Sequence, residues 1–493
     1  MSKGAQRGVE RMLYISLAAA VLFAPASAAP TLELVDCRIN AGPAYPGISA
    51  RCGMLERPLN PADASSPALR LRVAVVPALS LEPEPDPFVP IAGGPGQGTV
   101  EFYAGTARAF EKIRRNRDLV LLDQRGTGDS ARMDCDVEDE LVGGAYSEEE
   151  TRAATRECLA ALPFDPRYFT TSVAVTDLEA LRQALGYERL NLYGVSYGSR
   201  VAQHFARRYP GSTRSVILDG VVPPQLALGP GIAVEAQKAL DAIFARCADD
   251  EACNERFPGL AAGFEALRES LDAEPRILTL PHPLTGQPEV LSFAAAELAG
   301  AVRLLSYNPA SVALLPFLLQ EAIDGRLEPI AAQFLMIRDG MTDALALGMH
   351  NAVMCTEDAP YFGGEAISDE ELAATYIGPL MLAALRQICA VWPAGLIDDG
   401  FKTPLDSDLP VLLLSGDADP VTPPYFAEMA AVDLANAALL VGRNQGHGQA
   451  QRGCVPDIMA EFVATADPSA PDTDCLAQAF AMPFFLGYSG PAP

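Results

Sequence analysis

Short apolar runs recur along the chain, separated by stretches whose apolar residues have helical spacing. Residues 69–76 alternate between apolar and polar positions before becoming wholly apolar, which predicts an early strand. The amphipathic stretch 172–185 predicts a helix. Further strands are predicted at 88–92, 118–123, 190–193, 215–219, 409–414 and 438–441. Strands that alternate with helices are typical of a doubly wound, mostly parallel sheet, so we expect the α/β class.

The strand rhythm stops between residues 222 and 402. Ala- and Leu-rich segments there predict helices at 233–248, 260–273, 294–306, 310–323 and 370–391. The simplest interpretation is an α/β core interrupted by a helical cap over the carboxyl ends of the strands, where open sheets bind ligands. We therefore expect an N-terminal extension, the first part of the core, the cap and the last part of the core at 29–66, 67–221, 222–402 and 403–493.

The N-terminus has the pattern of a secretory signal peptide. Lys3, Arg7 and Arg11 precede or flank an apolar stretch at 12–23, and Ala-Ser-Ala ends at Ala28. An uncleaved membrane anchor is the alternative, but the stretch is shorter than the roughly 20 residues that a spanning helix needs. We expect cleavage after Ala28 and an exported protein, periplasmic or extracellular.

The ten cysteines all follow this segment and fall in near neighbours along the chain. Local disulfides in an oxidising compartment are the simplest interpretation, although spacing alone does not determine connectivity. A zinc site is disfavoured, because the chain has four histidines and no Cys-x-x-Cys pair. The expected pairs are Cys37 with Cys52, Cys135 with Cys158, Cys247 with Cys253, Cys355 with Cys389, and Cys454 with Cys475.

The chain is strongly acidic, with 63 Asp and Glu against 36 Lys and Arg and a formal net charge of −27 at pH 7. Such a surface repels nucleic acid and anionic lipid. We therefore expect no nucleic-acid partner and, once the signal peptide is removed, no membrane partner. The sequence leaves the oligomeric state open.

Residues 194–198 carry the most specific chemical pattern, Gly-x-Ser-x-Gly. A predicted strand precedes it and a predicted helix follows it, which is the context of a nucleophile elbow. The sharp turn would raise the Ser196 hydroxyl above the sheet, so Ser196 is the candidate nucleophile. A purely structural turn is the alternative.

A serine hydroxyl needs a base, and the base needs a third group that orients it. His447 lies in a Gly-flanked loop after the last predicted strand, where the order Ser, Asp, His places the base. His204 lies on the elbow helix, His282 in a Pro-rich turn and His350 on a cap helix, which makes them weaker candidates.

Three aspartates that follow predicted strands could orient the base. Asp419 is preferred, because two residues separate it from the strand-ending Gly416 and a proline follows it. Asp417 is more typical of a turn residue whose side chain bonds the backbone. Asp219 ends another strand, just where the cap begins.

Two backbone N–H groups are expected to stabilise the negative oxygen of the tetrahedral intermediate. One is that of Tyr197, directly after the nucleophile. The other comes from the Gly-rich loop after the strand at 88–92, with Gly94 preferred and Gly93 as the alternative.

Five short motifs occur in a characteristic order: Gly-Gly-Pro-Gly at 93–96, Asp-Gln-Arg-Gly-Thr-Gly at 123–128, the elbow, Gly-x-x-Asp-Pro-Val-Thr-Pro at 416–423 and Gly-His-Gly at 446–448. This set resembles the α/β-hydrolase exopeptidases, namely proline iminopeptidases and secreted tripeptidyl aminopeptidases. The resemblance covers about residues 70–480. Ala92 stands where the family usually has histidine.

The resemblance implies a serine aminopeptidase that acts on peptides with a free N-terminus and needs no metal or organic cofactor. An acidic cap residue must then meet the substrate ammonium group. Glu357, in a segment similar to a cap motif of the secreted branch, is the candidate, and Asp358 is the alternative. Either could instead be a structural carboxylate. Trp392 fits packing of the cap better than a place in the pocket.

The same motifs are compatible with other functions. An esterase or lipase-like hydrolase would use the same triad, since fold and triad do not determine the substrate. A catalytically silent binding protein is a third possibility, which the intact Ser196, Asp419 and His447 disfavour.

Overall fold

The computed structural model describes residues 1, 32–42, 47–135, 147–363, 367–478 and 480–491. The expected signal peptide lies outside the described residues, apart from Met1. Among the helices of the described part, none is long and apolar enough to cross a membrane.

A nine-stranded sheet forms the centre of the core, in the order β1-β2-β3-β5-β4-β6-β7-β10-β11. Six neighbouring strands, from β5 to β11, are parallel, and β1, β2 and β3 extend the sheet in antiparallel pairing. This confirms the predicted α/β class. The strands are β1 (Val35–Ile39), β2 (Ile48–Pro58), β3 (Ala68–Val76), β4 (Phe88–Ile91), β5 (Leu119–Leu122), β6 (Leu190–Val195), β7 (Thr213–Asp219), β10 (Val411–Gly416) and β11 (Ala437–Gly442).

Residues 35–39 and 48–58 of the N-terminal stretch are part of the sheet. The stretch 29–66 was expected as an extension ahead of the core, but it supplies the β1–β2 hairpin that pairs with β3. Ala50 and Leu55 are buried, and the rest of β2 is more exposed. The Pro- and Gly-rich flanks hide this strand pattern in the sequence.

Helices cover both faces of the sheet. Successive residues of a strand point to opposite faces: Leu192 packs with the cluster beneath α4, α5 and α15, whereas Tyr193 packs with the cluster beneath α1 and α16. The helices associated with the core are α1 (Thr99–Thr106), α2 (Glu111–Arg114), α3 (Glu148–Ala161), α4 (Thr171–Leu185), α5 (Tyr197–Arg208), α15 (Pro424–Ala431) and α16 (Val455–Thr465). Short helical turns are η1 (Ala107–Phe110), η3 (Pro166–Tyr168), η4 (Pro210–Ser212), η5 (Met354–Asp358), η6 (Ala359–Tyr361) and η7 (Asp474–Gln478).

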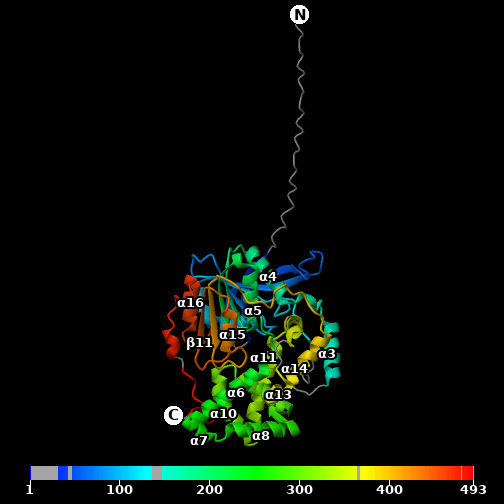
Figure 1. Ribbon diagram of the computed structural model, residues 1–493, viewed down its shortest axis with the longest axis vertical. Helices are drawn as coiled ribbons and strands as arrows, with labels where there is room; N and C mark the ends of the chain where they lie inside the picture. Colours follow the sequence, from blue (N-terminus) through cyan, green and yellow to red (C-terminus); the bar gives the residue numbers. More distant parts are fainter. Residues whose placement is uncertain (2–31, 43–46, 136–146, 364–366, 479, 492–493) are drawn as a thin grey trace.

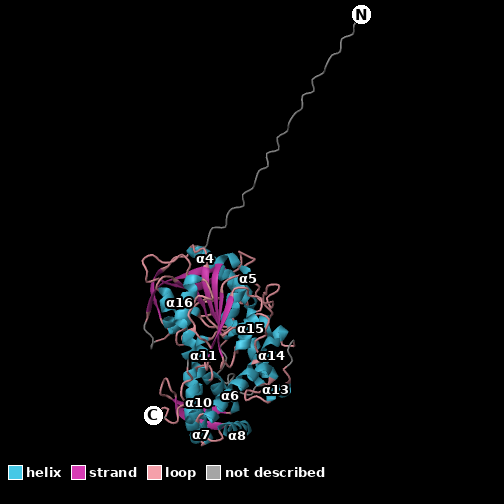
Figure 2. Ribbon diagram, turned by 60° about the vertical axis from the view of Figure 1, so that its left-hand side comes forward, coloured by secondary structure: helices cyan, strands magenta, loops and turns pink. Residues whose placement is uncertain are grey.

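The chain between β7 and β10 is mostly helical, and much of it packs around a hydrophobic cluster of its own. Figure 1 shows these helices below the sheet, and Figure 2 shows that the strands of the large sheet lie in the other half of the molecule. The helices are α6 (Ile232–Asp249), α7 (Glu251–Arg256), α8 (Leu260–Ala273), α9 (Ala295–Leu305), α10 (Pro309–Ile323), α11 (Glu328–Ala344), α12 (Leu347–Val353), α13 (Asp369–Ala373) and α14 (Leu380–Val391).

The sequence predicts only helices in this region, and the structure differs from that prediction in two places. Between α8 and α9, strands β8 (Arg276–Pro281) and β9 (Pro288–Phe293) form an antiparallel hairpin. The single helix predicted at 370–391 is two helices, α13 and α14, because Gly378 adopts a positive φ of 67° and Pro379 follows it.

The C-terminal segment also crosses the expected boundary. Phe484 belongs to the hydrophobic cluster of the inserted helices, and the Phe485 N–H donates to the carbonyl of Ala313 in α10 at 2.9 Å. Figure 1 accordingly shows the C-terminus beside α7 and α10. Residues 484–486 therefore pack on the inserted region and not on the sheet.

The disulfide pattern agrees with the sequence prediction. The structure pairs all ten cysteines, and each pair is one of the five expected neighbours. One of these disulfides, between Cys355 and Cys389, connects η5 to α14. Disulfide formation is typical of extracellular or periplasmic proteins.

Candidate active site

Ser196 occupies the turn between β6 and α5 and has a positive φ of 55° with ψ −126°. This backbone conformation is strained for a residue with a side chain and is often found at functional sites. The turn needs its glycines: a Cβ on Gly194 would lie 2.2 Å from the carbonyl oxygen of Gly198. A Cβ on Gly198 would lie 2.3 Å from the carbonyl oxygen of Ile91. The observed strand, turn and helix match the predicted elbow.

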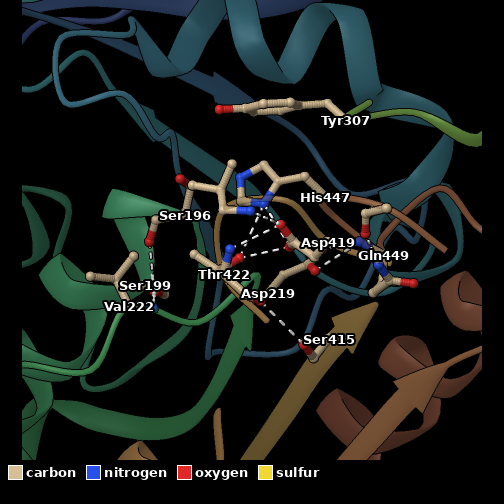
Figure 3. Close-up of polar contacts among 12 residues, drawn as sticks. Ser196, Ser199, Asp219, Val222, Tyr307, Ser415, Asp419, Thr422, His447 and Gln449 are labelled. Carbon is tan, nitrogen blue, oxygen red and sulfur yellow. Dashed lines mark hydrogen bonds and ion pairs between the residues drawn. The ribbon is translucent and has the colours of Figure 1, made fainter. Parts of the chain in front are cut away.

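His447 and Asp419 form a short hydrogen bond. The Nδ1 atom of His447 lies 2.8 Å from Oδ2 of Asp419, whose side chain is fully buried. Asp419 also accepts from the Thr422 hydroxyl at 2.7 Å and from the backbone N–H groups of Val421 and Thr422 (Figure 3). The carboxylate is thereby held in one orientation, and the Nε2 atom of His447 is left to act as the base.

The electrostatics of this pair favour the charged forms of both groups. Burial works to raise the pKa of Asp419, but the charge and hydrogen bond of His447, together with the hydrogen bonds from Thr422, hold the pKa below its ordinary value. Burial likewise works to lower the pKa of His447, but the Asp419 carboxylate, with a contribution from the charge of Asp219, raises that pKa above its ordinary value. The pair is therefore suited to stabilise an imidazolium ion.

Tyr307 holds His447 from the side of the inserted helices. Its carbonyl oxygen accepts from the His447 N–H at 2.8 Å, and its ring meets the imidazole edge-on with centroids 5.2 Å apart (Figure 3). The residue lies between α9 and α10, about 140 positions before His447 in the chain. No local motif marks it, so the sequence analysis missed it.

The two competing aspartates have other partners. Asp417 accepts from the backbone N–H of Asn444 at 2.6 Å and so braces the loop ahead of His447. Asp219 accepts from the Tyr193 hydroxyl at 2.8 Å and from the N–H groups of Gln449 and Ala450. Asp219 therefore holds the loop that follows His447 without bonding to the imidazole.

The other three histidines have other partners, although His350 also lines the cavity that contains Ser196 and His447. His204 bonds Asp398 at 2.9 Å and His282 bonds Asp339 at 2.8 Å. The Nδ1 atom of His350 lies 3.2 Å from the carbonyl oxygen of Pro95. Of the four, His447 alone pairs with one of the three candidate aspartates.

The Gly-rich loop after β4 lies directly against Ser196. A Cβ on Gly93 would be 3.1 Å from Cβ of Ser196 and 3.7 Å from its hydroxyl oxygen. Gly94 adopts a positive φ of 105°, and a Cβ there would be 2.7 Å from the backbone nitrogen of Gly96. Tyr197 is the first residue of α5, where backbone N–H groups lack helical partners. These positions suit an oxyanion site.

A cavity of about 1850 Å³ opens at Ser196. Ser196, His447 and the Gly-rich loop line it from the core, and residues of α9, α11 and α14 line it from the inserted region. Its charged lining includes Asp272, Glu289, Glu297, Arg268, Arg303, Arg338 and Arg452.

The structure does not bring Glu357 and Asp358 to this cavity. Glu357 lies in η5, is fully buried and accepts from the backbone N–H and hydroxyl of Thr171 at 2.7 and 2.9 Å. Asp358, also fully buried, accepts from Arg200 at 2.9 Å and from Lys402 at 2.8 Å. Neither carboxylate lines the cavity, which corrects their expected contact with substrate.

The Glu357 network nevertheless reaches the elbow. The Thr171 hydroxyl that bonds Glu357 lies 2.6 Å from the Tyr197 hydroxyl, which also accepts from Gln124 at 3.1 Å. Burial raises the pKa of Glu357 to about 7 despite the hydrogen bonds from Thr171. Trp392 is buried and belongs to the main hydrophobic cluster, in agreement with its expected packing role.

Comparison with known proteins places this arrangement in a family. A model described as "alpha/beta hydrolase fold" matches residues 86–245, and one described as "TAP-like protein" matches residues 374–475. The serine protease Hip1 of Mycobacterium tuberculosis is 27% identical over 426 residues, which cover 76% of this chain and 78% of the relative. The chain is a serine peptidase of the α/β-hydrolase fold.

Further similar proteins are named as aminopeptidases or iminopeptidases. The tripeptidyl aminopeptidase of Streptomyces lividans is 30% identical over 155 residues, covering 27% of this chain and 28% of the relative. The probable proline iminopeptidase of Streptomyces coelicolor is 32% identical over 144 residues, covering 28% and 34%. The solved proline iminopeptidase of Mycobacterium smegmatis aligns over 89% of this chain and all of its own, with 14% identity and a TM-score of 0.37.

Proposed function

We propose that this serine peptidase is an exported aminopeptidase that releases residues or short peptides from a free N-terminus. The observation that carries the proposal is the 2.8 Å bond from Asp419 to His447, which lines the same cavity as the strained Ser196. The relatives named as aminopeptidases support the class of substrate.

In the proposed mechanism Ser196 attacks the scissile carbonyl carbon while Nε2 of His447 takes the hydroxyl proton. Asp419 orients the imidazole and stabilises its positive charge. The backbone N–H groups of Gly94 and Tyr197 stabilise the oxyanion, and each such donor lowers the barrier by about 3–4 kcal/mol. His447 then protonates the leaving amine, and water releases the acyl group by the same steps.

A carboxylate on the cavity wall is needed for the substrate ammonium group. Because Glu357 and Asp358 lie outside the cavity, we assign this role to Glu297 of α9, which lines the cavity. One of its oxygens accepts from the backbone N–H of Ala294 at 2.7 Å, and no cationic side chain of the described residues lies within 4.0 Å of it. An ammonium ion would compensate this buried charge.

Export is the remaining part of the proposal. The basic start, the apolar stretch and the Ala-Ser-Ala sequence that ends at Ala28 indicate a cleaved signal peptide. The five disulfides support an oxidising compartment. N-terminal sequencing of the exported protein tests this part, with Ala29 as the expected first residue.

The activity is tested with p-nitroanilides of short peptides that carry free or acetylated N-termini, beside p-nitrophenyl acetate. We expect cleavage of the free peptides, at least tenfold slower cleavage of the acetylated ones, and loss of both in Ser196→Ala. Preference for the ester, or indifference to acetylation, would contradict the aminopeptidase assignment and favour an esterase.

A further inference from the structure

The cationic side chains of the cavity are not equivalent. Arg268 pairs with Glu265, and Arg338 pairs with Asp339 and Glu289. The charge of Arg452 is partly offset by the nearby Asp219. These three cations therefore have acidic neighbours within the protein.

Arg303 differs from them. No carboxylate of the described residues lies within 4.0 Å of its guanidinium group. Within the described part of the chain, its one hydrogen bond is from Nη2 to the neutral Tyr307 hydroxyl at 2.9 Å, and its Nε is buried without a partner there. A guanidinium group has five N–H donors in a fork that matches a carboxylate. Arg303 thus presents unused donors and an uncompensated charge to the cavity.

Arg303 also lies close to the reacting atoms. Its guanidinium carbon is 5.7 Å from the centre of the Tyr307 ring, and that ring is 5.2 Å from the imidazole of His447. The positive charge of Arg303 works to lower the pKa of His447, although Asp419 outweighs it. A substrate group that binds Arg303 would therefore lie only a few substrate residues away from the scissile bond.

We infer that Arg303 is a specificity residue that binds a carboxylate group of the substrate. The inference rests on the proposed function and narrows it to anionic peptides. The carboxylate comes either from the C-terminus of a short peptide or from an acidic side chain. A local cation matters here because the chain, with its net charge of −27, otherwise repels anions.

A structural role for Arg303 makes a different prediction. If the residue only positioned Tyr307 against His447, its loss would lower kcat for all substrates equally. Loss of a carboxylate contact instead raises KM for anionic substrates and leaves neutral ones unchanged.

The test compares matched substrates that differ in one carboxylate. Tetraalanine and its C-terminal amide probe the C-terminus, and p-nitroanilides of Ala-Ala-Asp and Ala-Ala-Asn probe a side chain. Mono-p-nitrophenyl glutarate and p-nitrophenyl butyrate form an ester pair. Wild type, Arg303→Met, Arg303→Lys and the cavity-lining control Arg268→Met are assayed with each pair.

In one of the two peptide pairs, we expect the wild-type kcat/KM to be at least tenfold higher for the substrate with the carboxylate than for its neutral partner. The pair that shows this preference identifies whether the carboxylate comes from the C-terminus or from a side chain. Arg303→Met should reduce this preference to within twofold through KM, Arg303→Lys should restore part of it, and Arg268→Met should retain it. Equal losses on all substrates, an unchanged preference in Arg303→Met, or no preference in wild type would overturn the inference. If only esters are cleaved, the proposed function fails, and the ester pair then decides the role of Arg303 in the same way.

Discussion

Arg200 and Asp358 form a buried ion pair that joins α5, the helix after Ser196, to the inserted region. Nη1 of Arg200, in α5, lies 2.9 Å from both carboxylate oxygens of Asp358, in η5, and the side chains are 1% and 0% exposed. Lys402 adds a second cation to the same carboxylate. The pair places Asp358 in the framework behind the elbow and not in the substrate cavity.

Removing the Asp358 charge should therefore lower stability. Asp358→Asn leaves Arg200 buried without its anion, and breaking a buried pair in this way typically costs about 3–5 kcal/mol. Urea unfolding at pH 7 measures the free energy of unfolding. The exposed pair of Arg276 and Glu274 supplies the matched control, because Glu274→Gln should change stability by less than about 1 kcal/mol. Unchanged stability of Asp358→Asn with a raised KM would restore Asp358 as a substrate contact.

Asp419→Asn should reduce kcat by about 10⁴-fold, as expected when the carboxylate that orients a triad histidine is lost. The amide leaves the size of the side chain unchanged, but it no longer stabilises the imidazolium form of His447. Kinetics with a free N-terminal anilide measure the effect. Asp417→Asn, at the rival position, should change kcat less than tenfold, and the reverse order of the two effects would identify Asp417 as the acid.

The pH dependence of activity should report His447. The pKa of His447 is raised above its ordinary value of 6.5 by Asp419. Since the imidazolium form cannot accept the Ser196 proton, kcat/KM should fall as the pH drops through a midpoint above 6.5. The residual activity of Asp419→Asn should show this midpoint at a lower pH. A midpoint that does not move would contradict the pairing of the two residues in the active enzyme.

Glu357 should make stability depend on pH. Burial raises the pKa of Glu357 to about 7, so the folded state holds a proton that the unfolded chain releases near pH 4.5. Its contribution to stability is present below about pH 4.5 and is lost as the pH rises to about 7. The Tm of wild type should therefore fall between pH 5 and pH 8 relative to that of Glu357→Gln. Parallel Tm curves would show that Glu357 stays ionised in the folded protein.

The site of the substrate ammonium group can be decided between two carboxylates. Glu297→Gln should raise KM for substrates with a free N-terminus by tenfold or more, because the charge partner of the ammonium is lost. Acetylated substrates, measured in parallel, should be unaffected. Glu357→Gln should leave the KM values for free and acetylated substrates within twofold of those of wild type. A raised KM for free substrates in Glu357→Gln, with an unchanged KM in Glu297→Gln, would place the substrate amine at Glu357.

Much of the core could be predicted from the sequence, because its signals are local. The apolar runs at 190–193 and 215–219 lie within the observed β6 and β7, and the elbow lies between strand and helix as the motif requires. The predicted disulfide pairs are also confirmed, because each disulfide joins cysteines that are near neighbours in the sequence. The hairpin β8–β9 was missed because it interrupts a long helical region, and helix and strand signals are ambiguous in short apolar runs.

The sequence by itself determined the fold class, the elbow and the candidates Ser196, Asp419 and His447, because each depends on neighbouring residues and on the order of elements. Only the tertiary structure decided which carboxylates face the cavity. Glu357 and Asp358 lie within the segment that is similar to a cap motif, but they are buried against Thr171 and Arg200, more than 150 positions away. Contacts of this kind depend on how distant segments pack, which no local pattern encodes.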